Sequence, residues 1–155
     1  MPLTHSGLIE VRRVKGKGRG VFARRPIREG EAIERVPVLV LPAAEIKDGE
    51  GWTGLAGFCF LWGEGTVALA LGYGSLYNHS FRPNARYDDR GPRLKVFTAL
   101  RDIGPGEEIT VNYNGEPNDR TPVGFKVIES PRPRPAGRKP PGRVVISRAR
   151  DSNHA

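Results

Sequence analysis

The residues best suited to chemistry lie between Gly74 and Tyr87, in a stretch that reads Gly-Ser-Leu-Tyr-Asn-His-Ser-Phe-Arg-Pro-Asn-Ala-Arg-Tyr. Its Asn-His pair, its Pro-Asn turn and its two tyrosines supply amide, imidazole and phenol groups that donate and accept hydrogen bonds. A turn at Pro83-Asn84 places these groups where the backbone changes direction. Functional groups held by a rigid scaffold are most often found at such places, so this stretch is the predicted core of an active site.

Two other segments carry related signals. Residues 15–20 place three glycines within five positions, which lets the backbone take positive φ or come close to something bulky. Residues 106–113 follow a Gly-Pro turn and run through an apolar strand to Tyr113. Each segment alone is a weak signal, because Gly-x-Gly and Asn-His-Ser occur in many loops. The three in this order, closed by the tyrosine, form a specific signal.

The three segments resemble the motifs of the SET domain, the fold of S-adenosylmethionine-dependent protein-lysine methyltransferases. The first reads Lys-Gly-Arg-Gly-Val-Phe-Ala from Lys17, the second reads Tyr-Asn-His-Ser from Tyr77, and the third reads Gly-Glu-Glu-Ile-Thr-Val-Asn-Tyr up to Tyr113. The resemblance covers residues 8–113. It implies transfer of methyl groups from S-adenosylmethionine to the side-chain amine of a lysine in a protein substrate.

The resemblance also implies two catalytic residues. Tyr113 matches the family's catalytic tyrosine, whose phenol stands at the end of the lysine channel beside the methyl group. Tyr87 matches an aromatic residue that lines the channel in some members. Val111 stands where the family often has Phe or Tyr, so the number of methyl groups transferred stays open. A lone histidine suggests a general base, but in this family His79 acts through its backbone, and no acid-base role is expected for it.

A cofactor site built from all three segments follows from the same resemblance. The glycine motif gives the cofactor close backbone contact, with Lys17 or Arg19 available for its carboxylate. For these two cations a solvated hairpin tip is an equal alternative. The Asn78 side chain contacts the amino-acid portion of the cofactor, and the His79 backbone holds the adenine. The expected cofactor-binding residues are Lys17, Gly18, Arg19, Gly20, Asn78, His79, Tyr113 and Phe125.

In the family a segment after the last motif covers the cofactor, and in many members zinc holds it. The single cysteine, Cys59, leaves no cysteine cluster for a metal, so the chain resembles a small SET-only member without cysteine-rich flanking regions. We expect no metal site, and we expect Phe125 with Val127 or Ile128 to form the cover. Cys59 lies in an apolar run and is expected to be a small buried hydrophobe.

The fold class expected is mostly β, built from several small sheets. Runs of apolar and β-branched residues bounded by Gly, Pro and Asp predict strands at 8–12, 21–23, 32–41, 66–71, 85–89, 93–100 and 109–113. Pro37 and Pro42 cannot donate to a ladder, so the strand over 32–41 is predicted at an edge or with a bulge. Residues 43–65 form a glycine-rich insert in which Trp52 and Trp62 are expected to pack. The resemblance adds a pseudoknot that brings the Asn-His motif and Tyr113 together.

Charge and composition divide the chain into two parts. Of 25 Lys and Arg, seven lie in residues 131–155 with one acid, so that segment carries +6 and the remainder carries +2. Its prolines and cations predict a disordered basic tail. We therefore expect a SET domain at 1–130, with a motif-bearing core at 8–113 and a cover at 114–130, followed by the tail at 131–155.

The expected partner is a protein that presents a lysine, and the tail is a candidate contact for nucleic acid. A competing interpretation is a catalytically weak SET-like module that binds a partner or nucleic acid through this tail. The start of the chain shows no signal peptide and no apolar run approaches the length of a membrane span. A soluble intracellular protein is expected, cytoplasmic or associated with nucleus or nucleoid, with its oligomeric state open.

Overall fold

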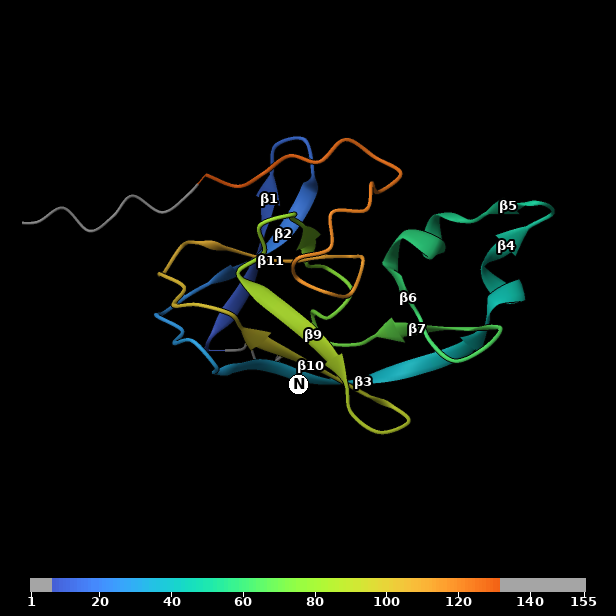
Figure 1. Cartoon of the computed structure of the whole chain (residues 1–155), viewed down its shortest axis with the longest axis horizontal. Helices are drawn as coiled ribbons and strands as arrows, with labels where there is room; N and C mark the ends of the chain where they lie inside the picture. The colour runs from blue at the N-terminus through green and yellow to red at the C-terminus, as the bar shows by residue number, and fades with distance from the viewer. Residues whose placement is uncertain (1–6, 132–155) are drawn as a thin grey trace, which may run out of the picture.

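Short strands and turns make up almost all of residues 7–131, the part of the chain that the computed structural model describes (Figure 1). This confirms the mostly β fold class. The strands are β1 (Ile9–Val14), β2 (Gly18–Ala23), β3 (Ala32–Pro42), β4 (Lys47–Asp48), β5 (Gly51–Trp52), β6 (Cys59–Leu61), β7 (Thr66–Ala70), β8 (Asn78–His79), β9 (Ala85–Asp89), β10 (Leu94–Ala99) and β11 (Glu108–Val111). Two 3₁₀ helices, η1 (Ala43–Ile46) and η2 (Gly54–Phe58), lie in the insert. The predicted tail falls outside the described residues, apart from Pro131.

The first sheet unites the three sequence motifs. Its strand order is β1-β2-β11-β8, with β1 and β2 forming an antiparallel hairpin around the glycine motif. β11 pairs antiparallel with β2 and parallel with β8, so that Val111 lies opposite His79. The pairing brings the Asn-His motif beside the strand that leads into Tyr113. This is the neighbourhood that the expected pseudoknot requires.

The second sheet has the order β6-β7-β3-β10-β9 and supports the site from below in Figure 1. Of the two alternatives predicted for residues 32–41, the edge is wrong, since β3 pairs with β10 along its first half and with β7 along its second. The bulge is present, because Phe97 pairs with Glu34 and Thr98 with Ala32, which leaves Ile33 of β3 unpaired in the register. Pro37 lies where the partner changes, opposite Leu94, and its carbonyl accepts a hydrogen bond from the Leu71 N–H at 3.0 Å. A proline is tolerated in this central strand because no single partner strand runs past it. The register irregularity in this pairing lies between Phe97 and Thr98 rather than at either proline.

A single hydrophobic core joins the two sheets. Val21 and Ile109 from the first sheet and Phe97 from the second are fully buried, and they belong to one cluster of contacting apolar side chains. Tyr77, just before β8, stacks on Phe97 with ring centroids 4.4 Å apart. Burial of apolar surface is the main favourable term in folding, so the core fixes the chain on both sides of the Asn-His motif.

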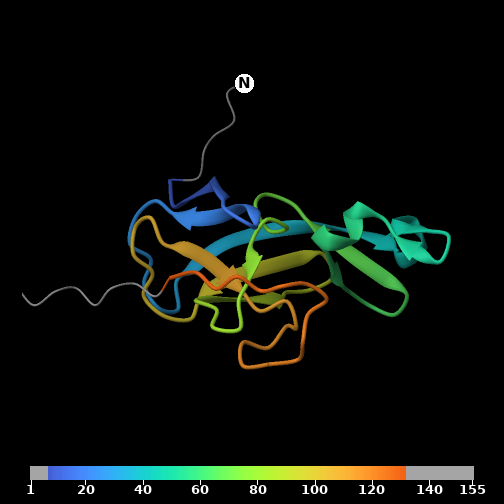
Figure 2. The ribbon, with the colours of Figure 1, turned by 90° about the horizontal axis from the view of Figure 1, so that it is seen from above.

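The insert between β3 and β7 extends beyond one end of both sheets, as Figures 1 and 2 show. Trp52 is 61% exposed and the Lys47 ammonium lies 4.9 Å from its ring centroid, so Trp52 does not pack into the core as expected. Trp62 is partly buried and does contact the core cluster. The insert therefore stands out from the sheets while its last strand, β6, anchors it to β7.

Candidate active site

A cavity of 420 Å³ opens where the insert meets β9, β10 and the end of β11. Both predicted catalytic tyrosines line it, as does Phe125. A second hollow of 510 Å³ lies beside Ser80 and Phe81, and neither predicted tyrosine lines it. The remaining lining residues of the smaller cavity are Ala56, Gly57, Phe58, Cys59, Phe60, Leu61, Gly74, Ser75, Tyr77, Asp89, Lys95, Asn114 and Gly115.

The phenol of Tyr113 is held in a fixed direction at this cavity. Its Oη donates a hydrogen bond to the Tyr77 carbonyl at 2.6 Å, and its backbone N–H donates to His79 Nδ1 at 3.0 Å. Burial, with a smaller effect of the Glu108 carboxylate, raises the pKa of Tyr113 to about 12. The hydroxyl is therefore neutral at physiological pH, and its lone pairs remain available to accept a hydrogen bond.

Tyr87 meets Tyr113 from the neighbouring strand β9. Its Oη donates to the Tyr113 carbonyl at 3.2 Å, and its ring lies edge-on to Phe60 with centroids 4.9 Å apart. Burial raises the pKa of Tyr87 to about 12, with Asp89 and Tyr113 adding smaller effects. The structure thus brings together the two tyrosines that the sequence predicted to be catalytic.

His79 supports Tyr113 and is unsuited to proton transfer. It is 4% exposed, and burial lowers its pKa although the Glu129 carboxylate opposes this. Because Nδ1 accepts the Tyr113 N–H, the neutral ring carries its proton on Nε2. Nε2 is buried and has no hydrogen-bond partner among residues 7–131. An imidazole that is neutral and holds a backbone N–H serves to position Tyr113.

Asn78 belongs to a buried polar network rather than standing free in a pocket. Its Nδ2 donates to the Arg19 carbonyl at 2.9 Å and to Glu108 Oε1 at 2.7 Å. The Lys17 ammonium lies 2.8 Å from Glu108 Oε2, and both side chains are nearly buried. Ser130 donates to the same Glu108 oxygen. Either Lys17 or Arg19 was predicted to be available for the cofactor carboxylate, and the partner that the structure shows for Lys17 is Glu108.

Gly18 and Gly20 of the hairpin are glycines for two different structural reasons. Gly18 has a φ of +81°, a conformation that residues with a side chain rarely adopt. Gly20 is buried beneath the polar network, and a Cβ there would lie 2.6 Å from Glu108 Oε1 and 2.7 Å from Asn78 Nδ2. Gly18 therefore serves the backbone conformation of the turn, while Gly20 lets the hairpin come close to Glu108 and Asn78.

The segment after β11 returns across the site, as the family resemblance implied. The Phe125 ring lies edge-on to His79 and to Tyr113, with centroids 6.0 Å from each, and the side chain is 53% exposed. Ile128 packs against the hairpin at Gly16, where a Cβ would come within 2.6 Å of it. Phe125 and Ile128 therefore lie where a cover for this site is needed.

Glu129 is a site residue that the sequence interpretation missed. Its carboxylate accepts hydrogen bonds from the Ser80 hydroxyl and, at 3.0 Å, from the Phe81 N–H. These bonds tie the end of the cover segment, residues 114–130, to the Asn-His-Ser motif. No local pattern marks this glutamate, because its partners lie 48 and 49 positions away in the chain.

Lys95 is the second missed residue, and it forms part of the cavity wall. It is 1% exposed, and its ammonium lies 4.2 Å from the ring centroid of Phe60, 5.2 Å from that of Trp62 and 4.6 Å from that of Tyr87. Asp89 completes its surroundings with a direct ion pair. Aromatic faces attract cations, so these groups hold the charge in the wall. A signal existed in the sequence, since Lys95 alternates with the buried Phe97 on the same face of β10.

Three other features of residues 7–131 bear on function: metal binding, the single cysteine and membrane insertion. No group of three or more His, Cys, Asp and Glu is arranged there to hold a metal ion. Cys59 is half-buried at the cavity rather than fully buried, and burial raises the pKa of its thiol. No helix in this part of the chain is long and apolar enough to cross a bilayer.

Comparison with known proteins agrees with this geometry. The SET-domain family model matches residues 18–114. A Schizosaccharomyces pombe protein named as a histone-lysine N-methyltransferase specific for H3 lysine-37 is 38% identical over 115 residues, which are 73% of this chain and 77% of that protein. A Chaetomium globosum histone-lysine N-methyltransferase, SET9, is 32% identical over 96 residues, 61% of this chain but 13% of that protein.

A solved structure of similar fold leads to the same family. A crystal structure from Plasmodium falciparum, described as a candidate histone methyltransferase, superposes with a TM-score of 0.59 at 28% identity, covering 70% of this chain and 95% of that one. SET-domain enzymes take their methyl group from S-adenosylmethionine. The chain therefore belongs to the SET-domain family and is an S-adenosylmethionine-dependent protein-lysine N-methyltransferase.

Proposed function

We propose that this enzyme methylates a lysine of a histone, with histone H3 as the first candidate, and that Tyr113 is its catalytic tyrosine. The observation that carries the proposal is that Tyr113 and Tyr87 line one aromatic cavity, with the Tyr87 hydroxyl donating to the Tyr113 backbone carbonyl. The name of the Schizosaccharomyces pombe relative supports histone H3 as substrate. Residues 7–131, which include all three motifs and the cover segment, form the proposed SET domain.

The cavity favours the neutral form of a lysine amine, which is the form that can accept a methyl group. A lysine in water has a pKa near ~10.4 and is almost fully protonated at neutral pH. Removal of water from around the amine disfavours the ammonium by desolvation, and a substrate amine lacks the ion pair with Asp89 that Lys95 has. Phe60, Tyr87 and Phe125 supply apolar walls of the cavity. A substrate lysine that enters therefore loses its proton to solvent more readily than it does outside.

Tyr113 orients that amine by accepting a hydrogen bond. Because its own proton is donated to the Tyr77 carbonyl, the phenol oxygen presents lone pairs toward the cavity. An amine N–H that donates to this oxygen has its lone pair turned away from it, toward the group it attacks. Tyr87 holds the Tyr113 backbone carbonyl, so the two phenols act as one rigid unit. Such positioning removes orientational freedom that the reaction would otherwise have to overcome.

The residues around Asn78 fit S-adenosylmethionine, which supplies an electrophilic methyl group when it is bound. Asn78 Nδ2 is used within the protein, which leaves Oδ1 as an acceptor for the cofactor's ammonium group. The buried Nε2–H of His79 and the half-exposed ring of Phe125 offer a donor and an apolar face beside it. Lys17, Gly18, Arg19 and Gly20 border the same place from the hairpin.

The proposal is tested by methyl transfer to purified histones. The full chain is incubated with S-adenosylmethionine carrying a labelled methyl group and with each core histone separately, and modified lysines are identified by mass spectrometry. We expect label on one or a few lysines of H3. This label should be lost when those lysines are replaced by arginine. Transfer to another histone alone would contradict the choice of H3, and transfer to none would contradict a histone substrate.

A further inference from the structure

Positive charge in the described domain is concentrated in one hairpin. Residues 10–28, which we call the basic hairpin, contain eight Lys or Arg and one acid, a net charge of +7. The other described residues contain ten Lys or Arg and fifteen acids, a net charge of −5. The net charge of the described domain is therefore small only because the positive charge of the basic hairpin and the negative charge of the other residues nearly cancel.

The basic hairpin keeps like charges side by side. Arg13 of β1 and Arg19 of β2 are directly opposite each other in the antiparallel register, and Lys15 follows in the connecting turn. Like charges directly opposite on two strands destabilise a sheet. All three side chains are exposed, and the structure gives none of them an ion pair with an acid of residues 7–131. The repulsion between these cations is therefore not offset by a nearby acid among residues 7–131.

Three other cations of the basic hairpin have side-chain partners, which separates them from these three. Lys17 points inward to Glu108, Arg12 pairs with Glu10 and lies over the Phe22 ring at 5.3 Å, and Arg25 lies 3.6 Å from Glu31. Three cations without an ion pair to residues 7–131 are therefore gathered at the distal end of the hairpin, around Lys15. An anionic partner would reach it without displacing an internal ion pair.

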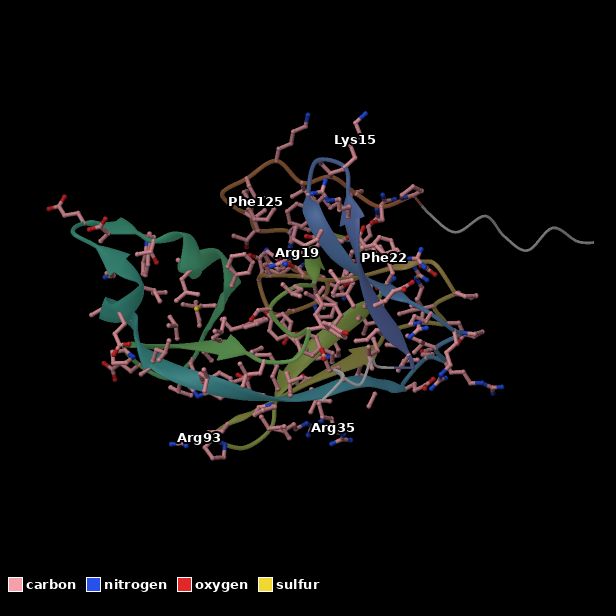
Figure 3. All side chains as sticks on the ribbon, turned by 180° about the vertical axis from the view of Figure 1, so that it is seen from behind. Lys15, Arg19, Phe22, Arg35, Arg93 and Phe125 are labelled. Atoms are coloured by element: carbon pink, nitrogen blue, oxygen red, sulfur yellow. The ribbon has the colours of Figure 1, made fainter. Side chains whose placement is uncertain are left out.

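This end of the hairpin lies next to the active site. Ile128 of the cover segment packs against Gly16 in the hairpin turn, and Phe125 of the same segment lines the cavity. Figure 3 shows Lys15 at the hairpin tip with Phe125 on the adjoining segment, while Arg35 and Arg93 lie at the opposite edge of the molecule. A partner bound at the tip would therefore be held beside the place where a substrate lysine enters.

We propose that the distal basic hairpin, centred on Arg13, Lys15 and Arg19, binds the phosphate backbone of duplex DNA. The choice of DNA rests on the proposed histone substrate, because histones in chromatin are packaged with DNA. A regular array of phosphates also fits closely spaced cations, and each neutralised phosphate releases condensed counterions that favour binding. The contact would be independent of sequence, since no base-reading element accompanies these side chains.

The test compares two charge reversals of equal size in the full chain. Arg13→Glu with Lys15→Glu changes the proposed surface, and Arg35→Glu with Arg93→Glu changes exposed arginines at the opposite edge. Residues 132–155 are the same in all three proteins, so their contribution cancels. Dissociation constants for a labelled 20-base-pair duplex are measured by fluorescence anisotropy at several salt concentrations. Methylation of free histone H3 is measured in parallel.

The hairpin variant is expected to bind the duplex roughly 10-fold or more weakly at 0.1 M salt and to lower the salt slope by about two, while the control pair stays within about 2-fold of wild type. Both variants should methylate free H3 at the wild-type rate. Equal losses in the two variants, or no loss in the hairpin variant, would overturn the proposal. Tighter binding to poly-glutamate than to DNA would reassign the surface to an acidic protein. Failure of H3 methylation with intact DNA binding would count against the substrate alone.

Discussion

At the scale of single residues, the site depends on polar groups that are already satisfied inside the protein. Tyr113 donates to Tyr77, His79 accepts from Tyr113, and Asn78 donates to Glu108. Each therefore presents its remaining acceptor or donor in a set direction. Preorganised groups of this kind stabilise a transition state without having to reorient during the reaction.

Replacing Asn78 by alanine tests its assigned place at the cofactor. The change removes a polar partner from a site that the cofactor would desolvate, which costs about 1–3 kcal/mol, or roughly 5- to 150-fold in the dissociation constant. Isothermal titration with S-adenosylmethionine should show this loss, while Asn118→Ala, an exposed position, should bind as wild type does. Wild-type affinity in Asn78→Ala would remove Asn78 from the cofactor site.

Lys95 offers a second test, because its charge and its stem have different roles. Methionine keeps a long apolar stem among the Phe60, Trp62 and Tyr87 rings, and the Asp89 carboxylate that is left behind is half-exposed and stays solvated, so loss of the ion pair should cost little. Alanine leaves a void beside these rings and should cost about 2–4 kcal/mol of unfolding free energy. Thermal melts of the two variants should therefore differ widely. Equal destabilisation would show that the charge, and not packing, is what the rings require.

Residue types were predicted well where a motif marks them and poorly where only the fold assembles them. Tyr87 and Tyr113 lie 26 positions apart and meet as expected. Glu129 was missed because its partners lie 48 and 49 positions away and no local pattern identifies them, and Lys95 was missed although its place on the buried face of β10 was a signal. The ion pair of Lys17 with Glu108 was not predicted, because it joins residues far apart in the chain that the β2–β11 pairing brings together.

At the scale of elements, the site is held by β11, which lies between the hairpin and β8. The strands at 85–89, 93–100 and 66–71 were predicted nearly to the residue because turns bound them clearly. β8 has two residues and β4 and β5 have two each, so they are too short for a periodic pattern. For β3 an edge or a bulge was predicted. The bulge is present, but the edge is not, since proline rules describe a strand with one partner throughout and β3 changes partner at Pro37.

Gly20 tests how closely these elements must approach. Gly20→Ala places a Cβ 2.6 Å from Glu108 and 2.7 Å from Asn78, so the polar network must shift. We expect a loss of roughly 1–3 kcal/mol in stability, as for a buried hydrogen-bonded group left unsatisfied, together with weaker cofactor binding. Gly104→Ala is the matched control, because its nearest atom would be 3.9 Å away. Unchanged melting and binding in Gly20→Ala would show that the network adapts freely.

At the scale of the whole molecule, one fold serves two surfaces: an aromatic cavity between insert and sheets, and a positively charged hairpin beside it. The cover segment joins them, since it contacts the hairpin through Ile128 and the cavity through Phe125. The charge separation could be read from the sequence once the domain was divided at residue 28. Its position next to the cavity could not, because it depends on where the chain returns after β11.

Two truncations test this division of the chain. Ending the chain after Pro131 should change the melting temperature by less than about 2 °C, because the sequence beyond it, rich in proline and arginine, has little apolar surface to bury. Ending it after Pro122 also removes Phe125, Ile128, Glu129 and Ser130 with their contacts, and should lower the melting temperature by about 5 °C or more. A large drop in the first truncation would show that residues 132–155 dock on the domain.

The central claim is that the Tyr113 hydroxyl orients the substrate amine, and single-turnover methyl transfer by Tyr113→Phe tests it most directly. One such hydrogen bond is worth about 2–4 kcal/mol in the transition state, so the rate should fall roughly 30- to 1,000-fold while cofactor affinity is kept. The wild-type rate should rise from pH 7 toward pH ~10 as the amine deprotonates, without a loss from phenol ionisation, since Tyr113 and Tyr87 each have a pKa of about 12. Near-wild-type turnover in Tyr113→Phe, or a rate that falls as the pH rises over this range, would contradict the account.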